Sequence, residues 1–178
     1  MLILVTGGAA SGKSARAEDI VCRLAGDGKK LYVAAMEPSG AEAQRRIARH
    51  RALRAGKGFD TLEHAKNFDR MRVPSGYAAA LLECLGTALA NEMFSPGGAG
   101  AHAADSILSG VAALTAACPH VVVVTNEIFS DGRTYDAGTM AYLRALGALN
   151  QQLARRADAV IESVCGIPVT RKGSTEFA

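Results

Sequence analysis

The sequence predicts an α/β protein, a three-layer sandwich in which helices cover both faces of a mostly parallel central sheet. Short apolar runs, several of them rich in β-branched residues, alternate with helical patterns along the 178 residues. This alternation is typical of βαβ units. The first run, residues 1–5 (MLILV), is bounded by glycine and followed by a helical pattern. We therefore expect a buried strand that leads directly into a helix.

The stretch after this strand carries the clearest chemical signal. Residues 7–14 (GGAASGKS) fit the phosphate-binding pattern G-x-x-x-x-G-K-[ST] at every fixed position. The glycines allow successive N–H groups to line an anion site at the start of a helix. Lys13 is expected to meet the β- and γ-phosphates, and Ser14 to bind Mg²⁺. The predicted nucleotide contacts in this loop are Gly7, Gly8, Ala9, Ala10, Ser11, Gly12, Lys13 and Ser14.

This loop makes the predicted sandwich a P-loop NTPase-like fold. Strands are expected over 1–5, 30–35, 59–63, 77–85, 121–125 and 158–164, and helices over 15–25, 41–54, 87–93, 103–117 and 139–157. The alanines of 77–85 leave a helix possible there. We expect a short helix and a loop over 64–76, loops at 95–100 and 129–139, and a polar tail after 166–168. The chain is expected to be one nucleotide-binding domain over 1–178, with a flexible tail at 173–178.

Composition narrows the class of protein. The formal net charge of +3 does not by itself favour nucleic acid. The four cysteines are widely spaced and include no C-x-x-C pair, so we expect reduced core residues in a cytoplasmic protein and no zinc site. We expect no signal peptide before the first strand, and no apolar run reaches the length of about 20 residues that spans a bilayer.

A basic segment follows the second predicted strand. Residues 41–54 contain His50 and five arginines, at 45, 46, 49, 51 and 54. The segment could be a solvated basic face, and it lacks the interleaved aromatics of a nucleic-acid site. It could also carry arginines to a triphosphate, where a neutral imidazole can attack phosphorus and form a phosphoramidate.

Candidate ligand contacts come from the ends of the predicted strands. In open α/β sheets ligands gather at the carboxyl ends of the strands, so Ala34, Ala35 and Met36 could line a nucleotide through their backbone. Glu83 is a lone acid in an apolar run and needs a cationic partner, which makes it a candidate for Mg²⁺ or nucleotide. Glu127 follows the strand at 121–125 and is a second candidate metal ligand. Glu63 is either a surface carboxylate or a ligand contact.

Several stretches together resemble one family, the bifunctional adenosylcobinamide kinase/adenosylcobinamide-phosphate guanylyltransferases of cobalamin biosynthesis. The similar stretches run nearly end to end: ILVTGG-xx-SGKS at 3–14, YVAA at 32–35, RIARHRALR at 46–54, T-x-E at 61–63, LLECL at 81–85, TNE at 125–127, LNQQLARRAD at 149–158 and GIP at 166–168. The first of these is common to many P-loop proteins, and the histidine-bearing RIARHR is far more specific.

The resemblance implies an enzyme with two reactions and ATP, GTP and Mg²⁺ as its cofactors. Adenosylcobinamide would be phosphorylated by ATP or GTP, and GMP from GTP would then pass to the product through a guanylylated histidine, giving adenosylcobinamide-GDP and pyrophosphate. The catalytic residues would be His50 and Lys13. Nucleotide contacts beyond the loop would be Ala34, Ala35, Met36, Arg51, Ala52, Leu53, Arg54, Glu63 and Glu83. Candidate metal ligands are Ser14, Glu83 and Glu127.

The resemblance also implies a homo-oligomer, a trimer in the family, with a corrinoid and a nucleoside triphosphate as its partners and no nucleic acid. Two alternatives stay open at this point. A P-loop small-molecule kinase without the transferase step would need no His50, and a regulatory GTP-binding module would bind GTP without turnover.

Overall fold

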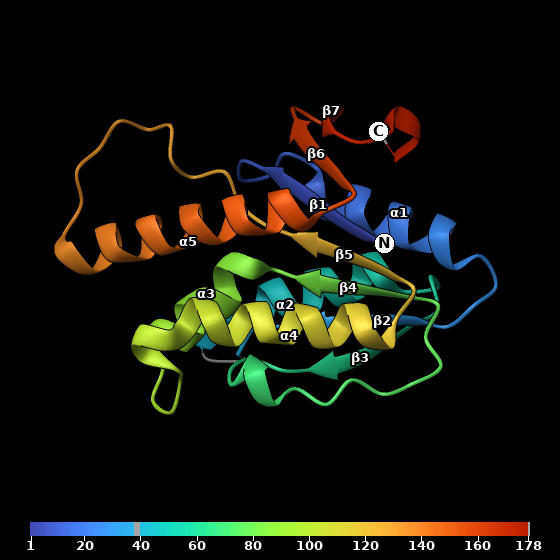
Figure 1. Cartoon of the computed structure of the whole chain (residues 1–178), viewed down its shortest axis with the longest axis horizontal. Coiled ribbons are helices and arrows are strands. Elements are labelled where there is room, and N and C mark those ends of the chain that lie inside the picture. Colours follow the sequence, from blue (N-terminus) through green and yellow to red (C-terminus); the bar gives the residue numbers. More distant parts are fainter. Residues whose placement is uncertain (38–39, 178) are drawn as a thin grey trace.

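A computed structural model describes residues 1–37 and 40–177, apart from the side chains at 42, 43, 46 and 53 (Figure 1). Its centre is a seven-stranded sheet of order β3-β2-β4-β5-β1-β6-β7. The strands are β1 (Leu2–Gly7), β2 (Lys30–Ala34), β3 (Phe59–Glu63), β4 (Ala79–Glu83), β5 (His120–Val124), β6 (Ala159–Val164) and β7 (Ile167–Lys172). All neighbours pair in parallel except β6 and β7. The predicted fold class is confirmed.

Helices lie on both faces of the sheet. They are α1 (Lys13–Ala25), α2 (Gly40–Arg54), α3 (Leu85–Phe94), α4 (Ala103–Ala117) and α5 (Ala137–Arg156), and the short 3₁₀ helices are η1 (Phe68–Arg70), η2 (Gly100–His102) and η3 (Thr175–Phe177). Each helix begins or ends within a few residues of the expected position. The run at 77–85, for which a helix was possible, contains a strand, because its apolar residues must fill the centre of the sheet.

The side chains of each strand alternate between two cores, as the period of two in a strand requires. On β1, Ile3 and Val5 pack with α1, whereas Leu2 and Leu4 pack with α3, α4 and α5. Figure 1 shows α3, α4 and α5 in front of the sheet and α1 behind it. The strands in the middle of the sheet are buried on both faces, which explains their continuous apolar sequences.

Two expectations about the C-terminal part were wrong. Residues after 166–168 were expected as a polar tail, but Ile167–Lys172 form β7, which pairs antiparallel with β6. This strand lies at the sheet edge and has no buried residue, so it lacks the continuous apolar run of a central strand. Cys165, expected in the core, is exposed in the turn between β6 and β7. The other three cysteines are buried or half-buried.

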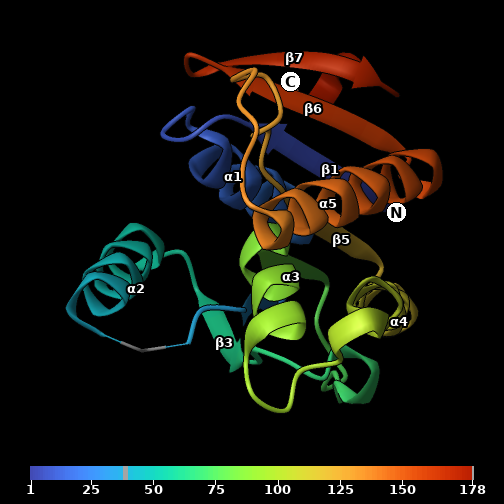
Figure 2. The same cartoon turned by 90° about the vertical axis from the view of Figure 1, so that its left-hand side faces the viewer.

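The carboxyl ends of the parallel strands meet at one edge of the sheet, which faces the viewer in Figure 2. Helix α2 stands apart from the other helices on one side of this edge. The loop at 95–100 forms a turn in which Ala99 N–H donates to the Glu92 carboxylate. Within the described residues, none of the helices combines the length and apolar character needed to cross a membrane.

Candidate active site

The loop at 7–14 joins the end of β1 to the start of α1. Gly12, directly before α1, has φ +85°, a left-handed conformation that glycine adopts without strain. The Lys13 ammonium donates to the Gly8 carbonyl at 2.9 Å, across the loop. The Ser11 carbonyl accepts from Gly166 N–H at 3.0 Å and from the Ser163 hydroxyl. The turn between β6 and β7 therefore braces the loop from outside.

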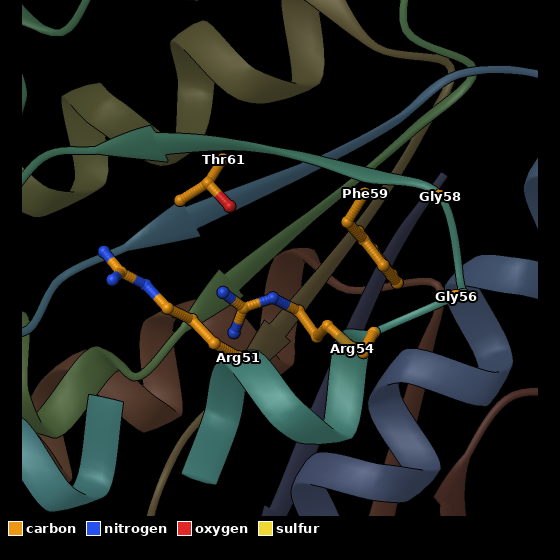
Figure 3. Close-up of a pocket in the computed structure, with 7 residues that line it drawn as sticks. Arg51, Arg54, Gly56, Gly58, Phe59 and Thr61 are labelled. Carbon is orange, nitrogen blue, oxygen red and sulfur yellow. The ribbon is translucent and has the colours of Figure 1, made fainter. Parts of the chain in front are cut away.

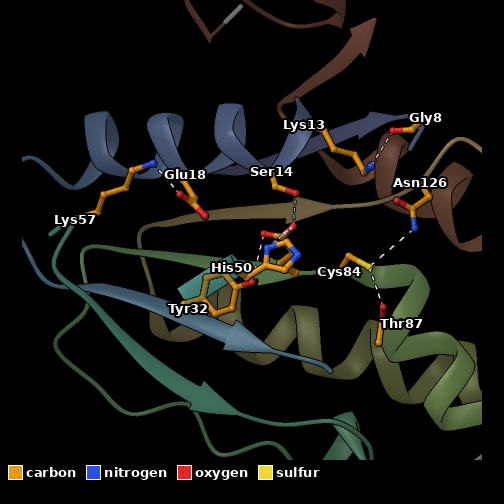
Figure 4. Close-up of polar contacts among 11 residues, drawn as sticks. Gly8, Lys13, Ser14, Glu18, Tyr32, His50, Lys57, Cys84, Thr87 and Asn126 are labelled. Atoms are coloured by element: carbon orange, nitrogen blue, oxygen red, sulfur yellow. Dashed lines mark hydrogen bonds and ion pairs between the residues drawn. The ribbon is translucent and has the colours of Figure 1, made fainter. Parts of the chain in front are cut away.

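A buried carboxylate, Glu83 at the end of β4, lies directly beside this loop (Figure 4). Its side chain accepts a short hydrogen bond from the Ser14 hydroxyl on Oε1 and one from Tyr32 OH on Oε2 at 3.4 Å. Glu83 is 8% exposed, so these contacts replace water around the charge. Strands β1 and β4 are separated by β5 alone, which brings Ser14 and Glu83 together.

The imidazole of His50 also lies beside the Glu83 carboxylate. His50 Nδ1 is 3.7 Å from Glu83 Oε1, too long for a hydrogen bond but close enough for an electrostatic contact. Nδ1 is buried and has no hydrogen-bond partner within the described residues. Because Nδ1 faces the carboxylate, Nε2 points to the opposite side of the ring. The predicted P-loop, Glu83 and His50 thus converge at one place.

Tyr32 belongs to this cluster, although the sequence did not single it out. The Arg54 guanidinium stacks over the Tyr32 ring at 3.4 Å from its centroid, a favourable cation–π geometry. Burial, followed by the charge of Glu83, raises the pKa of Tyr32 far above its usual value. Tyr32 therefore keeps its proton and donates to Glu83. Its signal in the sequence is a phenol between the aliphatic residues Leu31 and Val33 of β2.

A cavity of about 500 Å³ lies beside the cluster, between the end of α2 and β3 (Figure 3). Arg51, Arg54, Phe59 and Thr61 line it. Arg51 also pairs with Glu63 at 2.8 Å, with both side chains exposed. Arg54 is buried and its Nη1 has no hydrogen-bond partner in the described part of the chain. Of the predicted contacts at 51–54, the Leu53 side chain lies outside the described residues.

The remaining predicted contacts differ in their surroundings. Ala34 O accepts from His64 N–H, and Ala35 uses both backbone groups within the protein, so Met36 is the more available member of this segment. Glu127 Oε1 accepts from Phe129 N–H and the Ser130 hydroxyl of its own loop. Among the described residues, no three histidine, cysteine or acidic side chains cluster as metal ligands.

A family model described as cobinamide kinase / cobinamide phosphate guanyltransferase (CobU) matches residues 3–171. The chain belongs to this family. The bifunctional adenosylcobalamin biosynthesis protein CobU of Escherichia coli is 34% identical over 187 residues, covering 97% of this chain and 100% of that protein. The protein of the same name from Salmonella typhimurium is 35% identical over 188 residues, with the same coverage. The predicted family and enzyme class are confirmed.

A solved structure supports the fold of this CobU-family chain. A KaiC-like protein from Pyrococcus horikoshii has a TM-score of 0.53 and 12% identity, covering 98% of this chain and 80% of that chain. At this identity the likeness shows the fold alone.

A second ionic contact near the CobU-family site also went unpredicted. Lys57, after α2, pairs with Glu18 on α1 at 2.7 Å (Figure 4). The available signal was Glu18 itself, a carboxylate among the apolar residues of α1, of which Ala17, Ile20 and Val21 are buried. The sequence pattern does not show which cation meets it, because the partner lies 39 residues away.

Proposed function

We propose that this chain catalyses both reactions named in its family's description. It phosphorylates adenosylcobinamide with ATP or GTP, and it then transfers GMP from GTP to adenosylcobinamide phosphate through His50. The products are adenosylcobinamide-GDP and pyrophosphate. The observation that carries the proposal is the position of His50, 3.7 Å from the carboxylate that Ser14 of the P-loop hydrogen-bonds.

In the kinase step the loop at 7–14 binds the triphosphate. Backbone N–H groups at the start of α1 meet the phosphate oxygens, and Lys13 neutralises the charge that develops on the β- and γ-phosphates. The substrate hydroxyl attacks the γ-phosphorus, the bond from that phosphorus to the bridging oxygen breaks, and the hydroxyl proton is released. Such transfer depends on positioning and charge neutralisation more than on covalent chemistry by the protein.

The oxygen ligands at the centre of the site fit Mg²⁺. The Ser14 hydroxyl and the Glu83 carboxylate are adjacent hard donors, and Mg²⁺ in phosphoryl-transfer sites is bound by one or two such groups together with substrate phosphates. When bound, Mg²⁺ would supply neutralisation of the phosphate charge. Glu127 is the weaker candidate metal ligand, because its carboxylate accepts hydrogen bonds from Phe129 and Ser130 in its own loop.

In the transferase step His50 acts as the nucleophile. A neutral imidazole attacks the α-phosphorus through Nε2, the bond to the β-phosphate oxygen breaks, and pyrophosphate leaves. Glu83 faces Nδ1, so it stabilises the proton there and orients the ring, as a carboxylate beside a catalytic imidazole does. A phosphate oxygen of the corrinoid then attacks the same phosphorus, which breaks the N–P bond and frees His50.

The base and ribose lie on the side of Arg51 and Arg54 in this proposal. The cavity between α2 and β3 offers two guanidinium groups and the Phe59 ring to a purine, and Glu63 beside Arg51 offers a carboxylate. Ala34–Met36 would line the same side, together with Ala52 and Leu53.

We also propose that the chain forms one nucleotide-binding domain within a cytoplasmic homo-oligomer that binds no nucleic acid. One seven-stranded sheet, with β3 at one edge and β7 at the other, supports the single domain. The four cysteines are free, which suits a reducing compartment. The trimer rests on the family resemblance.

The test is covalent labelling of the purified chain with GTP labelled at the α-phosphate. Wild type is expected to retain an acid-labile label, and His50→Ala to lose it while still phosphorylating adenosylcobinamide. His64→Ala is the matched control, because His64 contacts Asn67 and Phe68 away from Glu83. Equal labelling of wild type and His50→Ala contradicts the proposal.

A further inference from the structure

Helix α2, which carries His50, is attached mainly by its last turns. Figure 2 shows it beside the molecule rather than packed in either helical layer. Described contacts from this end are His50 with Glu83, Arg51 with Glu63, and Arg54 with Tyr32. The His50–Glu83 distance of 3.7 Å is too long for a hydrogen bond, and the Arg51–Glu63 pair is exposed. The position of His50 therefore depends on what fixes the end of α2.

An ion pair between the half-buried Lys57 and the buried Glu18 lies at that end. The Lys57 ammonium is 2.7 Å from Glu18 Oε2, and Glu18 is completely buried. Glu18 Oε1 has no partner among the described residues. Burial alone would lower the pKa of Lys57, but the hydrogen bond and charge of Glu18 raise it above its usual value. A buried carboxylate without a cation is strongly unfavourable, so Lys57 is held firmly in place.

This pair connects α1 to the end of α2, the two helices whose Ser14 and His50 lie beside Glu83. On α1, Ser14 and Glu18 are four residues apart and share a helical face, as His50 and Arg54 do on α2. The backbone N–H of Lys57 donates to the Arg54 carbonyl at 3.0 Å, which holds Lys57 against the last turn of α2. Figure 4 shows the Lys57–Glu18 contact alongside the Ser14–Glu83–His50 contacts. The ion pair thus sets the spacing between α1 and α2, and with it the distance from the P-loop to His50.

We propose that Glu18 and Lys57 are positioning residues for guanylyl transfer, an inference that rests on the proposed function above. The pair clamps the end of α2 to the P-loop helix, so that the His50 imidazole stays within reach of the α-phosphorus. The kinase step uses the P-loop and does not use His50. Loss of the pair is therefore selective: it slows guanylylation and leaves the phosphorylation of adenosylcobinamide close to wild type.

The experiment compares the full-length wild type with Lys57→Met, which keeps the side-chain length and removes the charge. The rate of guanylylation is measured at saturating α-labelled GTP, beside the kinase turnover of the same preparation. A displacement of about 1 Å can slow a reaction on the order of 100-fold, so we expect a guanylylation loss of that size in Lys57→Met. Lys57→Arg retains a cation and is expected to restore most of the rate.

Two controls separate positioning from general damage. Asp19→Asn removes the exposed acid 3.6 Å from Lys57 and should leave both rates unchanged. Glu92→Gln replaces a buried carboxylate on α3 that accepts hydrogen bonds from Phe68 and Ser106 and from no described residue of α2. It should leave the ratio of the two rates unchanged.

The outcomes are distinct. Wild-type rates of guanylylation in Lys57→Met, or equal losses in both reactions, would overturn the positioning role. Failure of the wild type itself to become labelled would overturn the proposed function, and the positioning role would fall with it. A selective loss that Lys57→Arg repairs is the result we expect.

Discussion

At the scale of residues, a single carboxylate lies between the P-loop serine and the histidine. Glu83 Oε1 meets the Ser14 hydroxyl and faces His50 Nδ1, while Oε2 accepts from Tyr32. The side chain was predictable as a functional candidate, because a lone acid in an apolar strand is unfavourable without partners. The partners themselves come from α1, α2 and β2, and no local pattern names them.

Gly7 gives the first residue-scale prediction. A Cβ at this position would lie 2.5 Å from Ser11 Oγ and 2.6 Å from the Ser163 carbonyl. The carbonyl belongs to β6 and cannot rotate away. We expect Gly7→Ala to lower the free energy of unfolding by about 1–3 kcal/mol, as overpacking of a core does. Urea denaturation of the purified variant measures this loss.

The neighbouring Gly8 supplies the matched control. A Cβ there meets nothing within 4 Å, so Gly8→Ala should change the free energy of unfolding by no more than about 0.5 kcal/mol. Two variants of equal stability would show that the loop at 7–14 yields to a methyl group at either position, against the geometry described above.

At the scale of elements, Glu92 joins α3 to three other segments. Its carboxylate accepts from Phe68 N–H at 2.8 Å, from the Ser106 hydroxyl at 2.6 Å and from Ala99 N–H at 2.9 Å. Glu92 is completely buried. These bonds hold η1, α4 and the turn at 95–100 against α3. They also explain why a glycine-rich stretch, expected as a loop, forms a defined turn.

The pH dependence of stability follows from these bonds. Burial would raise the pKa of Glu92, but the hydrogen bonds from Ser106, Phe68 and Ala99 outweigh it and hold the pKa below its usual value of 4.5. Because the folded pKa is the lower one, the stabilisation is complete above about pH 4.5 and is lost as the pH falls through the folded pKa. We expect Glu92→Gln to cost about 1–3 kcal/mol at pH 7.

The measurement is urea denaturation of wild type and Glu92→Gln between pH 7 and pH 3. The difference between the two should shrink as the pH falls below about 4.5, because the unfolded wild type then takes up a proton that the folded state binds only at lower pH. A difference that stays constant across this range would contradict a charged, hydrogen-bonded Glu92 in the folded state.

The elements differ in how well sequence could predict them. β1, the P-loop and α1 were predictable because the pattern and its structure lie within 25 consecutive residues. β7 was not, since an edge strand that contains Pro168 and ends in Arg171 and Lys172 lacks the continuous apolar run of a core strand. The Glu18–Lys57 pair and Tyr32 were missed because only the tertiary fold brings their partners to them.

At the scale of the whole molecule, the site exists only when four separate elements are in place. Ser14 comes from α1, Tyr32 from β2, His50 from α2 and Glu83 from β4. The order of the sheet places β2 and β4 side by side and separates β4 from β1 by β5. A nucleotide bound at this edge therefore contacts elements from the first half of the chain that meet only in the native state, and its binding energy adds to folding stability.

The last prediction measures this coupling. A ligand at 100 times its Kd that binds only the native state adds about 2.7 kcal/mol. At roughly 2–4 °C per kcal/mol for a chain of this size, we expect GTP with Mg²⁺ to raise the Tm by about 5–10 °C. Chelation of Mg²⁺ should reduce the shift, because the Ser14 and Glu83 oxygens would lose the cation they share with the phosphates. Lys13→Ala removes the charge that meets the phosphates and should abolish most of the shift at the same GTP concentration. An equal rise in Tm for Lys13→Ala would mean that GTP binds elsewhere than the loop at 7–14.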